Sequence, residues 1–163
     1  MISFFSGIKP RVSSIRKTER SLSMKTIPET SPEHYLSGMA SLSIPSPQGT
    51  GDGHMLETFD DRNPNPLQFF AGNEIIRLLG TRGIINRSDD ADRAGIPHIG
   101  TLWCATHSRA VADMMVKSFL SGKDTKHIRM HDWLDGDGFK ETILMLKTIK
   151  DVSFRYWLSD KIR

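Results

Sequence analysis

Two stretches in the second half of the chain have the apolar spacing of amphipathic helices. In residues 107–120, apolar side chains recur three or four positions apart, at Ala110, Val111, Met114, Met115 and Phe119. Residues 138–150 repeat this spacing, at Phe139, Ile143, Leu146 and Ile149. Because one helical turn takes 3.6 residues, each set forms a stripe along one face. The pattern therefore predicts two amphipathic helices.

Polar residues and glycines at the ends of these segments support helical boundaries. Thr106 stands where its side chain can cap the first of the two helices, and Gly122 follows its end. Ser88 and Gly95 have the same relation to a shorter acidic segment, which predicts a third helix between them. The aromatic-rich residues 151–163 predict a final short helix.

Other segments, most of them in the first two thirds of the chain, instead favour short strands. Five segments have alternating apolar and polar residues or clustered β-branched residues, at 42–44, 54–59, 82–86, 96–106 and 128–134. A short helix is predicted from Pro32 to Leu36, and residues 73–79 fit either a helix or a strand. Short strands followed by helices are typical of an α+β fold. We therefore expect a small, mostly antiparallel sheet followed by two or three packed helices.

Charge divides the 163 residues into a tail and a body. Residues 1–23 hold five basic residues and one acidic residue, which leaves 17 basic and 18 acidic residues in the rest of the chain. We expect a disordered basic tail at 1–26, with Met24 as an alternative start, and one globular α+β domain at 27–163. A body with a net charge of about −1 argues against a basic nucleic-acid face. Any binding to nucleic acid is therefore predicted to depend on residues 1–23.

The composition also restricts the compartment and the chemistry. No apolar run approaches the roughly 20 residues that span a bilayer, so we expect no membrane insertion. The single cysteine, Cys104, cannot form an internal disulfide, which favours the cytoplasm. No nucleotide-binding or other cofactor motif is present, and we expect no cofactor.

The segment from Ser43 to Asp61 is the first candidate site. It concentrates glycines, carboxylates and a histidine, and its predicted binding residues are Gln48, Gly49, Gly51 and Asp52. Just beyond them, His54, Glu57 and Asp60 or Asp61 have the residue types of a metal-assisted hydrolase or nuclease. The alternative is a long hairpin loop in which glycine and aspartate serve turn geometry.

A second candidate is a zinc site. Cys104 and His107 form one pair, His127 and His131 form another, and both pairs have ligand-like spacing. A predicted helix separates the pairs, which departs from the zinc-finger pattern. The alternative is that these histidines are unrelated.

The last candidate is a surface for protein recognition. Methionine faces adapt to varied partners, and tyrosine and tryptophan supply much of the energy in interfaces. Met114 and Met115 on the first predicted helix, with Tyr156 and Trp157 near the end, are therefore predicted binding residues. Because no catalytic motif is complete, we expect a small regulatory protein of the antitoxin, immunity or adaptor type, which docks onto a partner protein. The hydrolase and the nucleic-acid-binding tail remain the alternatives.

Overall fold

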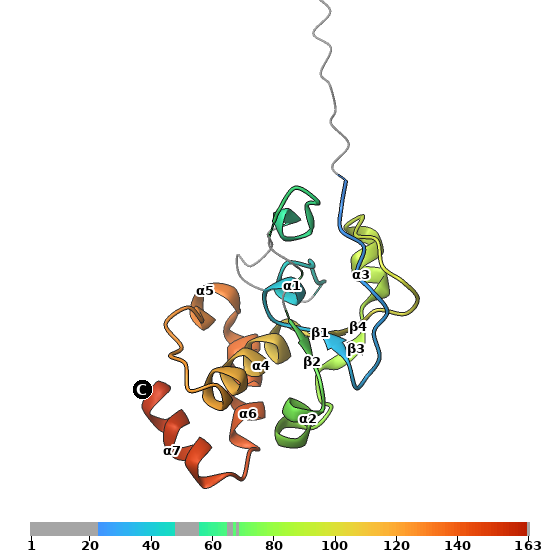
Figure 1. Cartoon of the computed structure of the whole chain (residues 1–163). Coiled ribbons are helices and arrows are strands. Elements are labelled where there is room, and N and C mark those ends of the chain that lie inside the picture. Colours follow the sequence, from blue (N-terminus) through green and yellow to red (C-terminus); the bar gives the residue numbers. More distant parts are fainter. Residues whose placement is uncertain (1–22, 48–55, 65–66, 68, 163) are drawn as a thin grey trace, which may run out of the picture.

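A small sheet of four short strands lies at the centre of the fold (Figure 1). The structure, a computed structural model, describes residues 23–47, 56–64, 67 and 69–162. Within these residues the strands are β1 (Tyr35–Leu36), β2 (Phe70–Ala71), β3 (Ile84–Asn86) and β4 (Trp103–Ala105), in the order β2-β1-β4-β3. The outer pairs, β1–β2 and β3–β4, are antiparallel, and the central pair β1–β4 is parallel. The fold is therefore α+β, as predicted.

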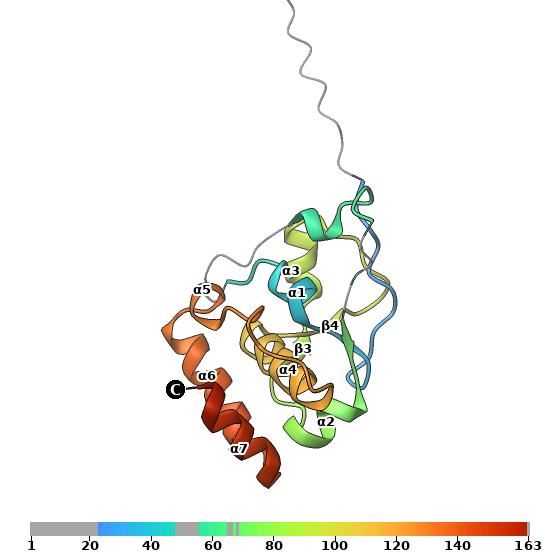
Figure 2. The ribbon, with the colours of Figure 1, turned by 60° about the vertical axis from the view of Figure 1, so that its left-hand side comes forward.

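Helices surround this sheet. Their bounds are α1 (Gly38–Leu42), α2 (Asn73–Leu79), α3 (Ser88–Arg93), α4 (His107–Leu120), α5 (Met130–Trp133), α6 (Gly136–Lys147) and α7 (Val152–Lys161). A 3₁₀ helix covers Leu56–Phe59. Helix α4 lies next to the sheet, α6 lies beyond it and α7 is outermost, while α3 lies on the opposite side (Figures 1 and 2). None of the helices in the described part of the chain is long and apolar enough to cross a bilayer.

Two hydrophobic clusters cover the two faces of the sheet. Successive side chains of a strand point to opposite faces. Accordingly, Tyr35 and Ala105 belong to the larger cluster, which includes residues of α4, α6 and α7. Their strand neighbours Leu36 and Cys104 belong to the smaller cluster, which includes Ala91 of α3. The two central strands, β1 and β4, are thus covered on both sides although they are only two and three residues long, whereas the edge strand β3 is partly exposed.

The order of helix and strand around Gly38 is the reverse of the prediction. Pro32–Leu36 was expected to be a helix but ends in β1, and the predicted strand at 42–44 follows directly from α1. The serines that made this segment look like a half-exposed strand are fully buried. Ser41, for example, donates its hydroxyl hydrogen bond to the carbonyl of Ala105 at 2.6 Å. In this segment the serines that alternate with apolar residues are therefore as buried as their apolar neighbours.

Other predicted strands are corrected in the same direction. Residues 128–134 contain α5, held by local bonds such as that from the Leu134 amide to the Met130 carbonyl at 3.0 Å. Of residues 54–59, the first two lie outside the described part and the rest form the 3₁₀ helix. Ser88 is the first residue of α3 rather than its cap, because its hydroxyl accepts a bond from the amide of Leu102. The strand predicted at 96–106 shrinks to β4.

The predictions for the long helices are confirmed. Thr106 caps α4 by accepting a hydrogen bond from the Arg109 amide, and Gly122 follows the helix with a φ of 66°. Helices α6 and α7 begin at aspartate caps, Asp135 and Asp151, whose carboxylates accept bonds from backbone amides. Residues 73–79, left open by the sequence, are helix α2.

The beginning of the described chain is attached to the body. The amide of Lys25 donates to the carbonyl of Phe59 at 2.7 Å, and Met24 forms a bridge with Asp60. Residues 23–26, predicted to belong to the tail, are therefore paired with the 3₁₀ segment. The remainder of the predicted tail, residues 1–22, lies outside the described residues.

Candidate functional site

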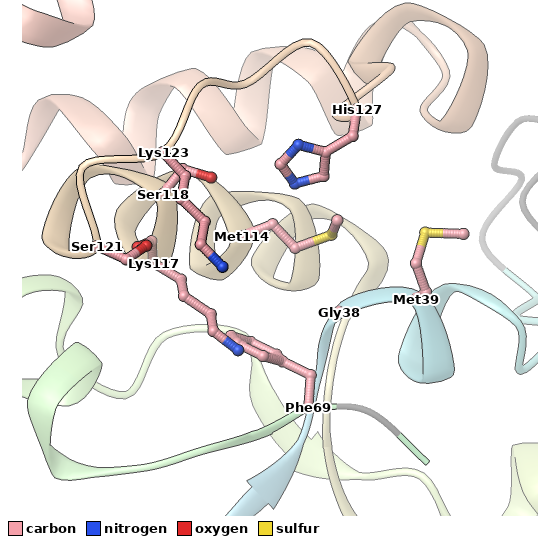
Figure 3. Close-up of a pocket in the computed structure, with 9 residues that line it drawn as sticks. All are labelled: Gly38, Met39, Phe69, Met114, Lys117, Ser118, Ser121, Lys123 and His127. Carbon is pink, nitrogen blue, oxygen red and sulfur yellow. The ribbon is translucent and has the colours of Figure 1, made fainter. Parts of the chain in front are cut away.

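A hollow between α1, α4 and the start of β2 is the candidate site that contains a predicted binding residue, Met114. It has a volume of about 300 Å³ and is lined by Gly38, Met39, Phe69, Met114, Lys117, Ser118, Ser121, Lys123 and His127. We call it the methionine pocket. In Figure 3, Lys117 lies beside the ring of Phe69, while Lys123 and His127 reach in from the loop after α4. The pocket thus combines an apolar wall with cationic groups.

The lysines of the pocket have no acidic partner among the residues that the structure describes. In the described part of the chain, no carboxylate forms an ion pair with Lys117 or Lys123. The ammonium of Lys117 instead lies 4.1 Å from the centre of the Phe69 ring, a cation–π contact that fixes both side chains. The pocket therefore offers positive charge to an incoming anionic group.

A buried ionic network lies directly beneath the pocket. Asp113 accepts hydrogen bonds from the hydroxyls of Ser37 (2.7 Å) and Tyr35 (2.8 Å) and from Nε of Arg109 (2.7 Å). All four side chains have no exposed surface. Because Ser37 precedes Gly38 and Asp113 precedes Met114, the network fixes the backbone on both sides of the pocket. It joins β1 and α1 to α4.

Burial has the largest effect on the ionisation of this network. It raises the pKa of the Tyr35 phenol well above its ordinary value, and the nearby Asp113 carboxylate raises it further. Tyr35 is therefore a hydrogen-bond donor at neutral pH. Burial also raises the pKa of Asp113, while the Arg109 guanidinium and the two hydroxyls lower it. The network is closed to solvent, so we assign it a structural role.

A second buried arginine holds the other end of α1. Arg87 donates from Nη1 to the carbonyls of Ser41 (3.1 Å) and Ala105 (3.0 Å), and from Nη2 to that of Ile44 (2.8 Å). His107 also contacts the Ile44 carbonyl through Nε2, at 2.8 Å. Every buried side-chain nitrogen and oxygen in the described part of the chain has a hydrogen-bond partner. Arg87 therefore ties the end of α1 to the sheet, whereas Arg109 ties α4 to Tyr35 of β1 and to the carbonyls of Gly80 and Arg82.

The structure separates the predicted docking residues. Met114 is half-buried and lines the methionine pocket. Met115, the next residue along α4, is 1% exposed and belongs to the core, so its assignment to a binding surface is wrong. Tyr156 is 82% exposed. Trp157 is half-buried because it packs against Phe119 and Phe154, with ring centres 5.5 Å apart in each case.

The predicted carboxylates come together only in part. Glu57 and Asp60 line a second hollow, of about 230 Å³, together with Arg62. Arg62 holds the Asp60 carboxylate through side-chain and backbone hydrogen bonds, and these lower its pKa to about 2. Such a carboxylate stays ionised and is a weak proton acceptor at neutral pH. Asp61 accepts a hydrogen bond from the Ser23 hydroxyl.

The other residues of that first candidate cannot be placed. His54 and the predicted binding residues Gln48, Gly49, Gly51 and Asp52 all lie outside the described part of the chain. The hydrolase hypothesis, which needs His54, therefore stays a prediction. Among the residues that the structure describes, no group of three or more His, Cys, Asp or Glu side chains could hold a metal ion.

The four residues of the zinc hypothesis are all described, and they do not belong to any group of three or more His, Cys, Asp or Glu side chains that could hold a metal ion. The structure therefore adds no support to the zinc hypothesis. Cys104 is buried in β4, and His107 is bound to the Ile44 carbonyl. His127 lies at the methionine pocket, and the ring of His131 stacks on Phe139, with centres 4.6 Å apart.

Burial makes the Cys104 thiol unreactive, and this can be measured. It has no exposed surface, and burial raises its pKa, while the nearby Arg87 guanidinium lowers it. We expect the native protein to show almost no reaction with a thiol reagent such as Ellman's reagent. After unfolding in guanidinium chloride, the protein should release one equivalent of chromophore. Rapid labelling under native conditions would contradict the buried position of β4.

Most residues of the methionine pocket were missed by the sequence analysis. Met114, Lys117, Ser118 and Ser121 follow the i, i+3, i+4, i+7 spacing of one helix face, which marks a stripe beside the apolar one. Met39 and Phe69 gave no such signal, because they approach α4 only through the fold. Comparisons with protein-family models, with curated proteins and with solved structures give no match. The function is therefore inferred from the geometry of the site.

Proposed function

We propose that this protein is a cytoplasmic binding protein that docks a segment of a partner protein in the methionine pocket. The observation that carries the proposal is the combination of Met39, Met114 and Phe69 with two lysines that have no ion pair in the described part of the chain. Thioether side chains adapt to varied apolar shapes, so such a wall can accept a protein side chain.

The size of the pocket favours a side chain over a free cofactor. Sites for drug-sized molecules have volumes of roughly 300–1,000 Å³. The methionine pocket, at about 300 Å³, is at the lower limit of that range. One large side chain, or two small ones, fits this space. The partner would therefore insert an anchor residue there, which is how hot spots form in protein interfaces.

The lysines favour an anchor with an acidic neighbour. An exposed ion pair contributes only about 0–1 kcal/mol, so the apolar wall has to supply most of the affinity. The positive charge of Lys117 and Lys123 would instead select among partners and speed their association. A cytoplasmic location agrees with the single cysteine, Cys104, which is buried and unpaired. The antitoxin, immunity and adaptor classes all act by docking of this kind.

Peptide display can test this proposal directly. A phage library of random linear peptides would be selected on the full-length protein and on a variant carrying Lys117→Glu and Lys123→Glu. We expect the wild-type protein to enrich peptides that have an aromatic or long aliphatic residue next to Asp or Glu. The variant should lose this enrichment, because it repels the acid while leaving the core intact.

The matched control changes the same amount of charge elsewhere. Lys147 and Lys150 are exposed residues at and after the end of α6 that do not line the pocket. A Lys147→Glu, Lys150→Glu variant should select the same peptides as the wild-type protein. Failure of the wild-type protein to enrich any peptide family would overturn the proposal. The same conclusion holds if the pocket variant enriches the same family.

A further inference from the structure

A third hollow, distinct from the one at Glu57 and Asp60, borders the Phe69–Lys117 contact. It has a volume of about 350 Å³ and shares Phe69, Lys117 and Ser121 with the methionine pocket. Its remaining lining comes from β2 and the neighbouring ends of α2 and α4, and includes Ile75 and Leu120. We call it the β2 hollow. Because three residues belong to both spaces, the two hollows are neighbours that share the Phe69–Lys117 pair as a common border. We call the two neighbouring hollows together the groove.

The two ends of this groove differ in charge. The methionine pocket has Lys123 in addition to the shared Lys117. The β2 hollow contains the exposed carboxylate of Glu74, in the first turn of α2. In the described part of the chain, Glu74 forms no ion pair. The groove therefore has a cationic end and an anionic end, and it complements a ligand of the opposite polarity.

The position of β2 favours an extended ligand. The strand lies at one edge of the sheet and pairs only with β1 among the strands that the structure describes. An edge strand has backbone groups available to a further strand, and partner proteins commonly use this mode of docking. In an extended segment, residues i and i+2 point to the same side and lie about 7 Å apart. Two such side chains would occupy the two hollows on either side of Phe69.

We propose that the groove binds an extended peptide segment with two apolar anchors, an acidic residue beside one and a basic residue beside the other. The first anchor occupies the methionine pocket, where the acid meets Lys117 and Lys123. The second occupies the β2 hollow against Leu120, where the basic residue meets Glu74. This inference rests on the proposed function, since it specifies the partner segment for the same site.

Fluorescence anisotropy with labelled synthetic peptides tests the inference. One peptide has the order Glu-Ser-Trp-Ser-Leu-Ser-Lys between flanking glycines, so that both anchors and both charges point to the same side. The second peptide has the reverse order, so that either chain direction is sampled. We expect one of the two to bind the full-length protein. Leu120 is 42% exposed. The Leu120→Asn substitution should weaken binding of that peptide about tenfold, because apolar contact area is lost. Glu74→Lys should weaken binding of the same peptide about fivefold. The variant should also no longer prefer this peptide over one that lacks the lysine.

A matched control separates this effect from a general loss of surface hydrophobicity. Leu144, on α6, is 56% exposed and lines neither hollow, so Leu144→Asn should leave the affinity unchanged. If binding is abolished by Lys117→Glu with Lys123→Glu but is indifferent to Leu120→Asn and Glu74→Lys, the two-anchor inference is wrong and the proposed function stands. If neither peptide binds, the inference is also wrong, and peptide display decides separately whether the proposed function survives.

Discussion

Replacing Asp113 with asparagine should lower the free energy of unfolding by about 3–5 kcal/mol, as removal of one partner from a buried ion pair does. Arg109 would keep its charge, with no exposed surface and without its counter-ion. Asparagine keeps a single acceptor oxygen, so an amide NH2 group would face either Arg109 or the hydroxyls of Tyr35 and Ser37 in place of a carboxylate oxygen. Urea unfolding, followed by circular dichroism, measures the change.

Smaller substitutions in the same network calibrate this result. Ser37→Ala and Tyr35→Phe each remove one hydrogen bond to Asp113, and hydrogen bonds to charged groups contribute about 1.5–3 kcal/mol. Either variant should therefore be destabilised less than Asp113→Asn. The double variant Arg109→Met with Asp113→Asn should cost less than the sum of its single changes, because it leaves no isolated charge. A loss below about 1 kcal/mol for Asp113→Asn would contradict the ion pair.

This network also links stability to the proposed function. Ser37 and Asp113 directly precede Gly38 and Met114, which line the methionine pocket. A Cβ at Gly38 would lie 3.0 Å from Cβ of Phe69, so the backbone of α1 packs tightly against the pocket's aromatic wall. Loosening of the buried ties would therefore widen the pocket before the whole domain unfolds. When binding is measured on variants of the network, a loss of affinity caused by a widened pocket has to be distinguished from the loss of a direct contact with the ligand.

The parts of the fold that the sequence predicted are those in which local spacing and burial agree. The predicted stripe of α4 packs in the core, as do all members of the second stripe except Ile143, and Thr106 caps α4 as its position indicates. The order around Gly38 was not predictable by the same reasoning. Ser37, Ser41 and Ser43 are polar in sequence yet buried, and their hydroxyls are satisfied by Asp113, the Ala105 carbonyl and the Met39 carbonyl. Two of these three partners are more than 60 positions away in the sequence.

The candidate site was predictable only to the extent that it lies on one helix. Met114 belongs to the apolar stripe of α4 and was recognised, but the same stripe includes Met115, which faces the core. Spacing cannot separate two adjacent positions of a wide stripe. Phe69 and Lys123 join the site from other segments, and their approach to Lys117 depends on how α4 packs over the sheet. The electrostatic character of the pocket is thus a property of the tertiary structure.

Replacing Arg87 with methionine should also lower the free energy of unfolding by about 3–5 kcal/mol, since three buried carbonyls lose a charged donor and Asp90 loses its buried counter-ion. The guanidinium serves three backbone carbonyls and Asp90, and a methionine has no donor for any of them. Arg87→Lys should recover only part of the loss, because one ammonium cannot reproduce a planar fork of donors. The same unfolding measurement applies.

Arg93 supplies a matched control, because it binds the same carboxylate as Arg87. Its Nη2 lies 2.5 Å from Oδ1 of Asp90, but the Arg93 side chain is 62% exposed, whereas that of Arg87 is 2% exposed. An exposed ion pair contributes only about 0–1 kcal/mol, so Arg93→Met should be nearly neutral. Hydrogen exchange shows which part of the chain is affected. Arg87→Met should speed amide exchange in α1 and the residues after it, since Arg87 binds the carbonyls of Ser41 and Ile44. Equal effects of the two substitutions would mean that Asp90, rather than the backbone carbonyls, is the partner that matters.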